Sequence, residues 1–172
     1  MEFLELAKKR YSCRNFSNQK VEREKLEKIL EAGRVAPTAV NFQPQRILVL
    51  QEKEQLEKLH ECTPYGWDAP VIMIVCYDKN ISWKRKYDGK DEGIVDASIV
   101  TTHMMLEIAD LGLGTTWIGS FDPEKVREVY RIPDHYEIVA LLPVGYPSEE
   151  AAPTANHEKR NSLEEFVFWD FI

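Results

Sequence analysis

The sequence predicts an α+β fold in which helices pack on a mostly antiparallel sheet. Four runs rich in β-branched and aromatic residues stand among about five helical patterns, without the regular alternation of a doubly wound fold. The strongest pattern covers residues 94–111, where apolar side chains recur mostly in threes and fours, so that only a narrow face is polar. We expect this helix at the centre of the molecule.

Composition indicates one globular domain over residues 1–172, because 44% hydrophobic residues can bury a sizeable core. The net charge of -7 argues against nucleic-acid binding, and no signal peptide or run of about 20 apolar residues points to a membrane. The cysteines are odd in number and lack zinc spacing: Cys13, Cys62 and Cys76. We therefore expect free thiols, no metal site and a cytoplasmic protein.

The chain begins with a short helical pattern at residues 3–7, which leads into a basic cluster at residues 8–14. Arg10 and Arg14 lie four apart with Ser12 between them. Two planar cations and a hydroxyl suit a phosphate monoester or an anionic ring edge. A solvated charge run at a helix C-terminus would explain the same residues, because cations there favour the helix dipole.

A second amphipathic helix covers residues 22–36 and ends at Pro37. Its apolar face consists of Leu26, Ile29, Leu30 and Val35. The polar segment 37–44 follows, and then residues 47–50 read as a buried strand. A polar loop between buried elements is a natural ligand wall, although turn-forming and capping roles would also explain Thr38, Asn41 and Gln43.

Four further elements are read as scaffold. They are a surface helix at residues 52–60, a buried strand at 70–77, a helix at 124–130 started by Asp122-Pro123, and a strand at 137–144. The central helix stops at the glycine turn 112–114, and residues 115–118 form a β-branched and aromatic strand. Gly119 ends that strand, where a glycine lets a flat ligand lie against bare backbone.

Three stretches, taken together with their order along the chain, match a known pattern. They are Arg10-Tyr11-Ser12-Cys13-Arg14-Asn15-Phe16, then Ala36-Pro37-Thr38-Ala39 with Asn41 and Gln43-Pro44, then Gly112-Leu113-Gly114-Thr115-Thr116-Trp117-Ile118-Gly119. They resemble the signatures of the FMN-dependent nitroreductase family. Residues 159–167 are similar to the family's closing basic, leucine and acidic segment. The resemblance spans nearly the whole chain and implies a dimeric, nitroreductase-like α+β fold.

The resemblance implies site roles position by position. Arg10 and Arg160 would hold the FMN phosphate, and Ser12 and Arg14 would lie nearer the ribityl chain and the pyrimidine edge. Tyr11 belongs to the same stretch. Arg14 is the candidate for positive charge at the N1 and O2 edge of the flavin, where negative charge develops on reduction.

The same resemblance implies two further walls of the site. The backbone of Trp117, Ile118 and Gly119 would pass beside the flavin ring. The loop of Pro37, Thr38, Ala39 and Asn41 would reach the FMN of the partner subunit. The sequence departs from the family at Gln45, Ile47, Ser162 and Phe168. These departures concern the substrate pocket rather than the cofactor.

The implied activity is that of an oxidoreductase in which NADH or NADPH reduces FMN and a small-molecule acceptor, such as a nitroaromatic or quinone, then takes the electrons in a ping-pong cycle. A flavin-consuming or dehalogenating relative of the same fold, or a non-catalytic flavin-binding protein, would share the motifs. The basic and aromatic residues of segment 81–90 would cover the flavin or contact the nicotinamide, or form a solvated loop.

The end of the chain favours a homodimer. Six of the last seven residues are large and apolar: Phe166, Val167, Phe168, Trp169, Phe171 and Ile172. That much apolar surface needs cover, which a partner subunit would provide, as the resemblance also implies. A tail folded back over its own domain would satisfy the same requirement.

Overall fold

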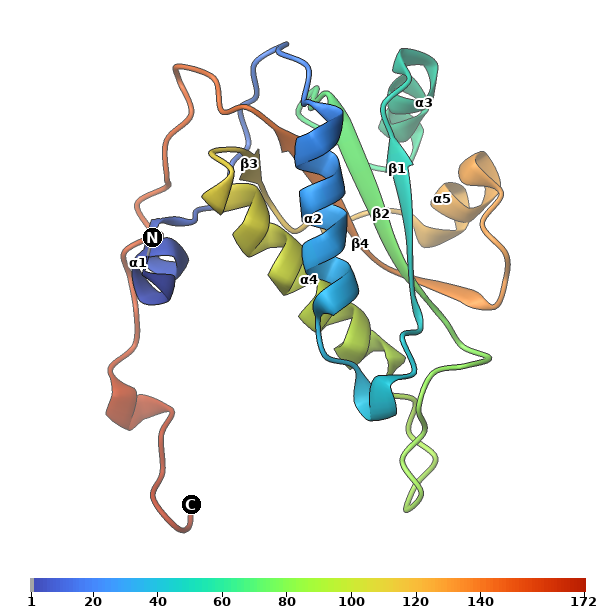
Figure 1. The fold of residues 1–172 in the computed structure, drawn as a ribbon, viewed down its shortest axis with the longest axis vertical. Coiled ribbons are helices and arrows are strands. Elements are labelled where there is room, and N and C mark those ends of the chain that lie inside the picture. Colours follow the sequence, from blue (N-terminus) through green and yellow to red (C-terminus); the bar gives the residue numbers. More distant parts are fainter. Residues whose placement is uncertain (1) are drawn as a thin grey trace.

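The computed structural model describes residues 2–172, and its centre is an antiparallel sheet in the order β1-β2-β4-β3 (Figure 1). The strands are β1 Gln45–Leu50, β2 Val71–Asp78, β3 Gly114–Thr115 and β4 Tyr136–Gly145. The helices are α1 Phe3–Lys9, α2 Arg23–Val35, α3 Lys53–Lys58, α4 Gly93–Asp110 and α5 Pro123–Tyr130, with 3-10 turns at Ala39–Asn41, Leu59–Glu61 and Leu163–Glu165. The predicted α+β architecture is confirmed.

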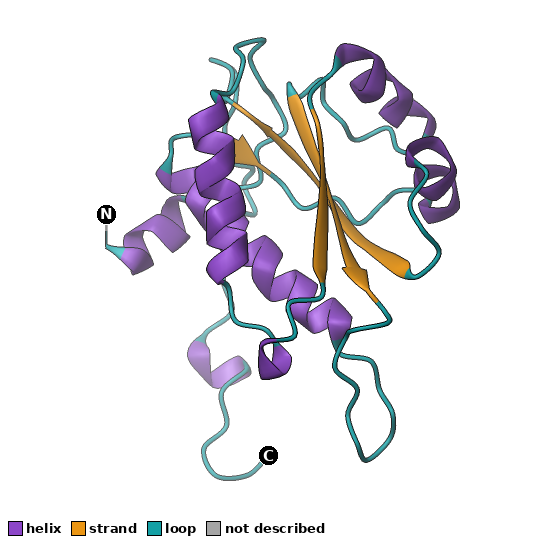
Figure 2. Ribbon diagram, turned by 45° about the vertical axis from the view of Figure 1, so that its right-hand side comes forward, coloured by secondary structure: helices purple, strands orange, loops and turns teal. Residues whose placement is uncertain are grey.

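Helices cover both faces of the sheet (Figure 2). One core cluster joins α2 and α4 to the sheet, and the other fills the space beneath α5 and the Leu59–Glu61 turn. Every residue of β2 is buried, as its unbroken apolar run predicts for a strand covered on both faces. Within residues 2–172, each helix is too short or too polar to span a lipid bilayer.

The central helix α4 packs closely against α2. A Cβ added at Gly33 of α2 would come within 3.0 Å of the Met104 side chain, so the glycine lets the two helices approach. Asp122 caps α5 as expected, because its Oδ1 accepts a hydrogen bond of 3.1 Å from the Lys125 amide.

Two details of the sequence interpretation are wrong. The strand expected at residues 115–118 is only Gly114–Thr115, and Ile118 forms an isolated bridge with Leu141. Val35, expected on the inward face of its helix, is exposed, and so are Ile94 and Val95 of α4. Periodicity identifies an apolar stripe, but it does not show whether the stripe is covered by the same chain.

The chain beyond β4 leaves the sheet and runs along one side of the molecule, and its C-terminus lies away from the sheet (Figure 1). Large apolar side chains of this tail are exposed: Leu163, Phe166, Phe168, Trp169, Phe171 and Ile172. The tail therefore does not fold back over its own sheet, which was the alternative to an interface.

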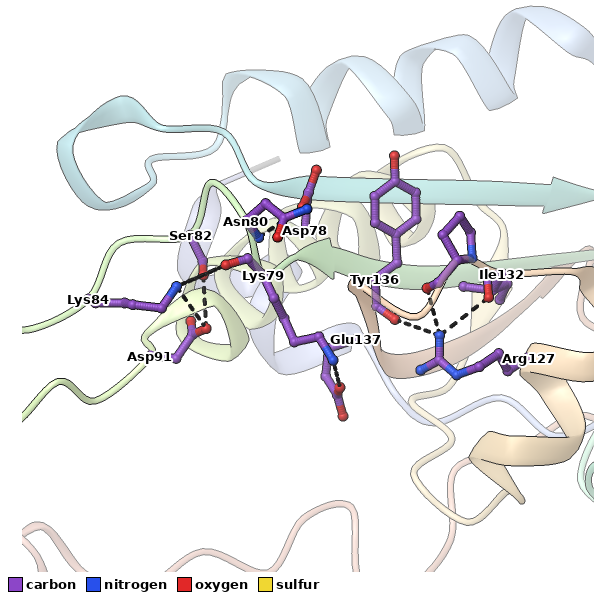
Figure 3. A network of polar contacts seen from close by, with 11 residues as sticks. Asp78, Lys79, Asn80, Ser82, Lys84, Asp91, Arg127, Ile132, Tyr136 and Glu137 are labelled. Carbon is purple, nitrogen blue, oxygen red and sulfur yellow. Dashed lines mark hydrogen bonds and ion pairs between the residues drawn. The ribbon is translucent and has the colours of Figure 1, made fainter.

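Segment 81–92 forms a hairpin between β2 and α4. At its base, Ser82 donates a hydrogen bond of 2.9 Å to Asp91, and Lys84 forms an ion pair of 3.6 Å with the same carboxylate (Figure 3). Tyr87 is 97% exposed. The basic and aromatic residues of this segment therefore lie on a hairpin that extends into solvent.

Candidate functional site

The segment Arg10–Arg14 is extended and attached to the short strand β3. The Cys13 amide donates to the Thr115 carbonyl at 3.0 Å, and Ser12 forms an isolated bridge with Thr115. Cys13 is fully buried, and a Cβ added at Gly114 would lie 2.7 Å from its sulfur. Side chains alternate in direction along extended backbone. Because the Cys13 side chain points into the core, those of Ser12 and Arg14 point the opposite way, toward solvent.

A polar cavity of about 300 Å³ lies where this segment meets the chain beyond β4. It is lined by Arg10, Tyr11, Ser12, Arg14, Thr154, Asn156, His157 and Arg160. Three guanidinium groups around one cavity are unusual for a chain of net charge -7. Their planar donors suit a phosphate monoester.

Arg160 is held by its own turn, because its Nη1 donates to the carbonyls of His157 and, at 2.7 Å, of Lys159. The His157 ring lies edge-on to Tyr11, with 6.3 Å between the ring centroids. Burial, and to a smaller extent Cys13, raises the pKa of Tyr11, so this residue lines the cavity as a neutral phenol able to donate a hydrogen bond. His157, and not Lys159, accompanies Arg160 in the cavity lining.

The chain after β3 forms an open platform beside this segment. Thr115 and Thr116 are buried, whereas Trp117 and Gly119 are exposed. Ile118 exchanges backbone hydrogen bonds of 3.0 and 3.1 Å with Leu141, which fixes the course of the platform. The nearest atom to a Cβ added at Gly119 is Trp117 Nε1 at 3.7 Å, so the backbone there is accessible to a flat ligand.

The loop Pro37–Asn41 lies at the other end of α4. Its Ala39 amide donates at 2.8 Å to Oδ1 of Asp96, a buried carboxylate in the first turn of α4. Val40 and Asn41 have φ values of 53° and 55°, a left-handed conformation that is costly for Val. Arg10, by contrast, shares a cavity with Ala109 in the last turn of α4 and with Gly112 and Leu113 just beyond it.

The structure therefore brings together only part of the expected site. The 18 residues of α4 separate its ends by about 27 Å. Within one subunit, the expected cofactor-binding residues Pro37, Thr38, Ala39 and Asn41 are thus remote from the arginine cavity. A ligand in that cavity can meet the loop only if the loop comes from another copy of the chain.

Sequence reasoning missed the wall formed by residues 63–68. The Thr63 hydroxyl donates at 2.7 Å to the Ser120 carbonyl, beside the platform. Trp67 lies against Arg14, with the guanidinium carbon 6.0 Å from the ring centroid. The available signal was the aromatic pair around a glycine, Tyr65-Gly66-Trp67, just before a buried strand. Thr154 and Asn156 of the cavity were missed as well.

Comparison with known proteins gives consistent matches along the chain. The model of the nitroreductase family matches residues 7–63 and 62–146. A Methanothermobacter thermautotrophicus protein named as an NADH dehydrogenase/NAD(P)H nitroreductase is 36% identical, over 87% of this chain and 79% of that protein.

Two solved structures extend the comparison. A nitroreductase family protein from Clostridium difficile is 47% identical, with a TM-score of 0.94 over 100% of both chains. An FMN-dependent nitroreductase from the same species is 26% identical, with a TM-score of 0.81 over 98% of this chain and 99% of that one.

Proposed function

The chain belongs to the nitroreductase family, and we propose that it is an FMN-dependent oxidoreductase that uses NADH or NADPH to reduce nitroaromatic, quinone or related acceptors. The observation that supports this most directly is the cavity with three arginines beside an open backbone platform. Its donors suit the phosphate of FMN, and the platform suits a flat ring system.

The residues present fit this cofactor by their chemistry. Arg10 and Arg160 would hold the phosphate, with Tyr11 and Ser12 as neutral donors nearby. Arg14 would place positive charge against the pyrimidine edge of the ring. The backbone of residues 117–119 would pass beside the ring, because Gly119 leaves it uncovered.

Bound FMN would supply the redox chemistry, taking a hydride from the nicotinamide and passing electrons to the acceptor. The protein has then only to bind, orient and stabilise charge. Arg14 is the proposed catalytic residue, since its charge would favour the reduced cofactor. Nicotinamide and acceptor would alternate over one exposed face, which gives a ping-pong cycle.

We propose further that the active unit is a homodimer with composite sites. The outer face of α4 carries an apolar hollow of about 510 Å³, lined by Ile94, Val95, Ser98, Ile99, Thr102 and His103. An exposed apolar face and an exposed apolar tail on one chain support burial against a second copy. This pairing would carry Pro37, Thr38, Ala39 and Asn41 of each subunit to the flavin of the other.

The proposal takes residues 1–172 as one FMN-binding domain located in the cytoplasm. Both core clusters lie against a single sheet, which supports one domain. The three cysteines are buried free thiols, as expected in a reducing compartment.

The test combines a spectrum with rapid kinetics. The purified protein should be yellow with noncovalent FMN, bleach with NADH or NADPH, and recover with a nitroaromatic or quinone; a storage protein would not bleach rapidly. Initial rates should give parallel double-reciprocal lines. Arg14→Ala should slow bleaching at saturating nicotinamide about tenfold or more, with a smaller loss of FMN affinity. A colourless protein that binds no added FMN would refute the proposed function, and intersecting lines would refute the ping-pong cycle.

A further inference from the structure

Arg14 is weakly held by the rest of the protein. Its Nη1 donates to the Ser12 carbonyl at 3.4 Å, near the limit for a hydrogen bond, and the side chain is exposed. Within residues 2–172 no carboxylate forms an ion pair with it. Arg14 also lies over the ring of Trp67, with 6.0 Å between the guanidinium carbon and the ring centroid.

Trp67, unlike Arg14, is well anchored. Its side chain is partly buried against the core cluster beneath α5, and the Tyr65 ring lies 5.6 Å away between centroids. Trp67 and Asp68 adopt left-handed φ values of 47° and 52°, although neither is glycine. Such backbone is costly and persists where the surroundings require it, often at functional sites.

The loop that carries Trp67 also contacts the platform. Thr63, 3% exposed, donates at 2.7 Å to the carbonyl of Ser120, next to Gly119. One short segment thus approaches Arg14 and also holds Ser120, the residue that follows the backbone expected beside the flavin ring. Any displacement of this loop would change the position of the guanidinium relative to the platform.

From this geometry we infer that Trp67 is a positioning residue, whose indole holds the Arg14 guanidinium at the flavin edge before the cofactor arrives. The inference rests on the proposed function. A planar guanidinium stacks on an aromatic face and is attracted to it, whereas an ammonium group matches that geometry poorly. Because the arginine is ordered in advance, less side-chain freedom is lost when the cofactor binds.

A double-mutant cycle tests this inference. Trp67→Leu keeps apolar bulk but removes the aromatic face, and should weaken FMN binding to the apoprotein about two- to fivefold. It should also lower the midpoint potential of the flavin, in the direction of Arg14→Ala. In the Arg14→Ala background, Trp67→Leu should have no further effect on either quantity. Trp67→Phe, the matched control, keeps an aromatic face and should stay close to the parent.

Arg14→Lys gives an independent test at an exposed position where substitution does not endanger folding. It keeps the charge but loses the planar guanidinium, so it should weaken FMN binding, and Trp67→Leu should then weaken it further by less than in the parent. Equal effects of Trp67→Leu with and without Arg14 would overturn the positioning role while leaving the flavoenzyme intact. An unmodified protein that binds no FMN would overturn the proposed function, and the inference with it.

Discussion

Removing residues 166–172 should separate the proposed dimer and release its flavin. Five side chains in this segment are more than half exposed: Phe166, Phe168, Trp169, Phe171 and Ile172. Burying each contributes about 1.5 to 3 kcal/mol, or roughly 7 to 15 kcal/mol together. If ordering of the tail offsets about half of this, the loss is still about 3.5 kcal/mol or more, an association at least a few hundredfold weaker.

The assay is size-exclusion chromatography followed at the flavin absorbance, with sedimentation velocity at micromolar protein. Full-length protein should elute as a yellow dimer, and the truncated chain as a colourless monomer or aggregate. Asp170→Asn is the matched control, because it changes a polar residue of the same segment and should leave the dimer intact. A truncated protein that elutes as a flavin-loaded dimer would refute the role of the tail. A full-length protein that holds FMN as a monomer would refute the composite site.

Two other predictions concern binding and stability. Arg10→Ala and Arg160→Ala should each weaken FMN binding about ten- to hundredfold in a fluorescence titration. Lys159→Ala should not, because Lys159 does not line the cavity. If both arginine variants bind FMN like the parent, Arg10 and Arg160 do not hold the phosphate and are ordinary surface charges. Burial raises the pKa of the Cys76 thiol to about 12, so this thiol stays protonated in the folded protein while the unfolded chain ionises above about pH 8.5. The free energy of unfolding should therefore fall as pH rises above that value, by up to about 1.4 kcal/mol per pH unit, and Cys76→Val should flatten this slope in urea titrations; an unchanged slope would count against the burial argument.

The regular elements could be predicted because their patterns record burial directly. The helix at residues 94–111 is α4 within one residue at each end, and the apolar run at 70–77 is β2. The strand after the glycine turn was expected to be longer, because Thr, Trp and Ile favour strands whether or not they are paired. Only Gly114–Thr115 pairs continuously with β4, and Trp117 is 37% exposed.

The site was harder to anticipate than the fold. Arg10 and Arg14 could be proposed because they are charged, closely spaced and part of a motif. Trp67 is part of no periodic pattern, and its relation to Arg14 depends on two left-handed residues that the sequence does not reveal. The exposure of Ile94 could not be predicted for another reason. An apolar residue gives the same sequence pattern whether it is covered by its own chain or by a second one.

Ala39 is anchored at the first turn of α4, whereas Arg10 lies near its last turn. This separation has a consequence for mutant alleles of the gene. In a composite dimer each site would take its arginines from one polypeptide and its loop from the other. If a subunit defective in the arginines pairs with one defective in the loop, one site collects both lesions and the other has none. Two inactive alleles of the gene would thus complement each other within a single protein. In a mixed dimer with a wild-type subunit, an allele defective in either the arginines or the loop would inactivate one of the two sites and leave the other site functional.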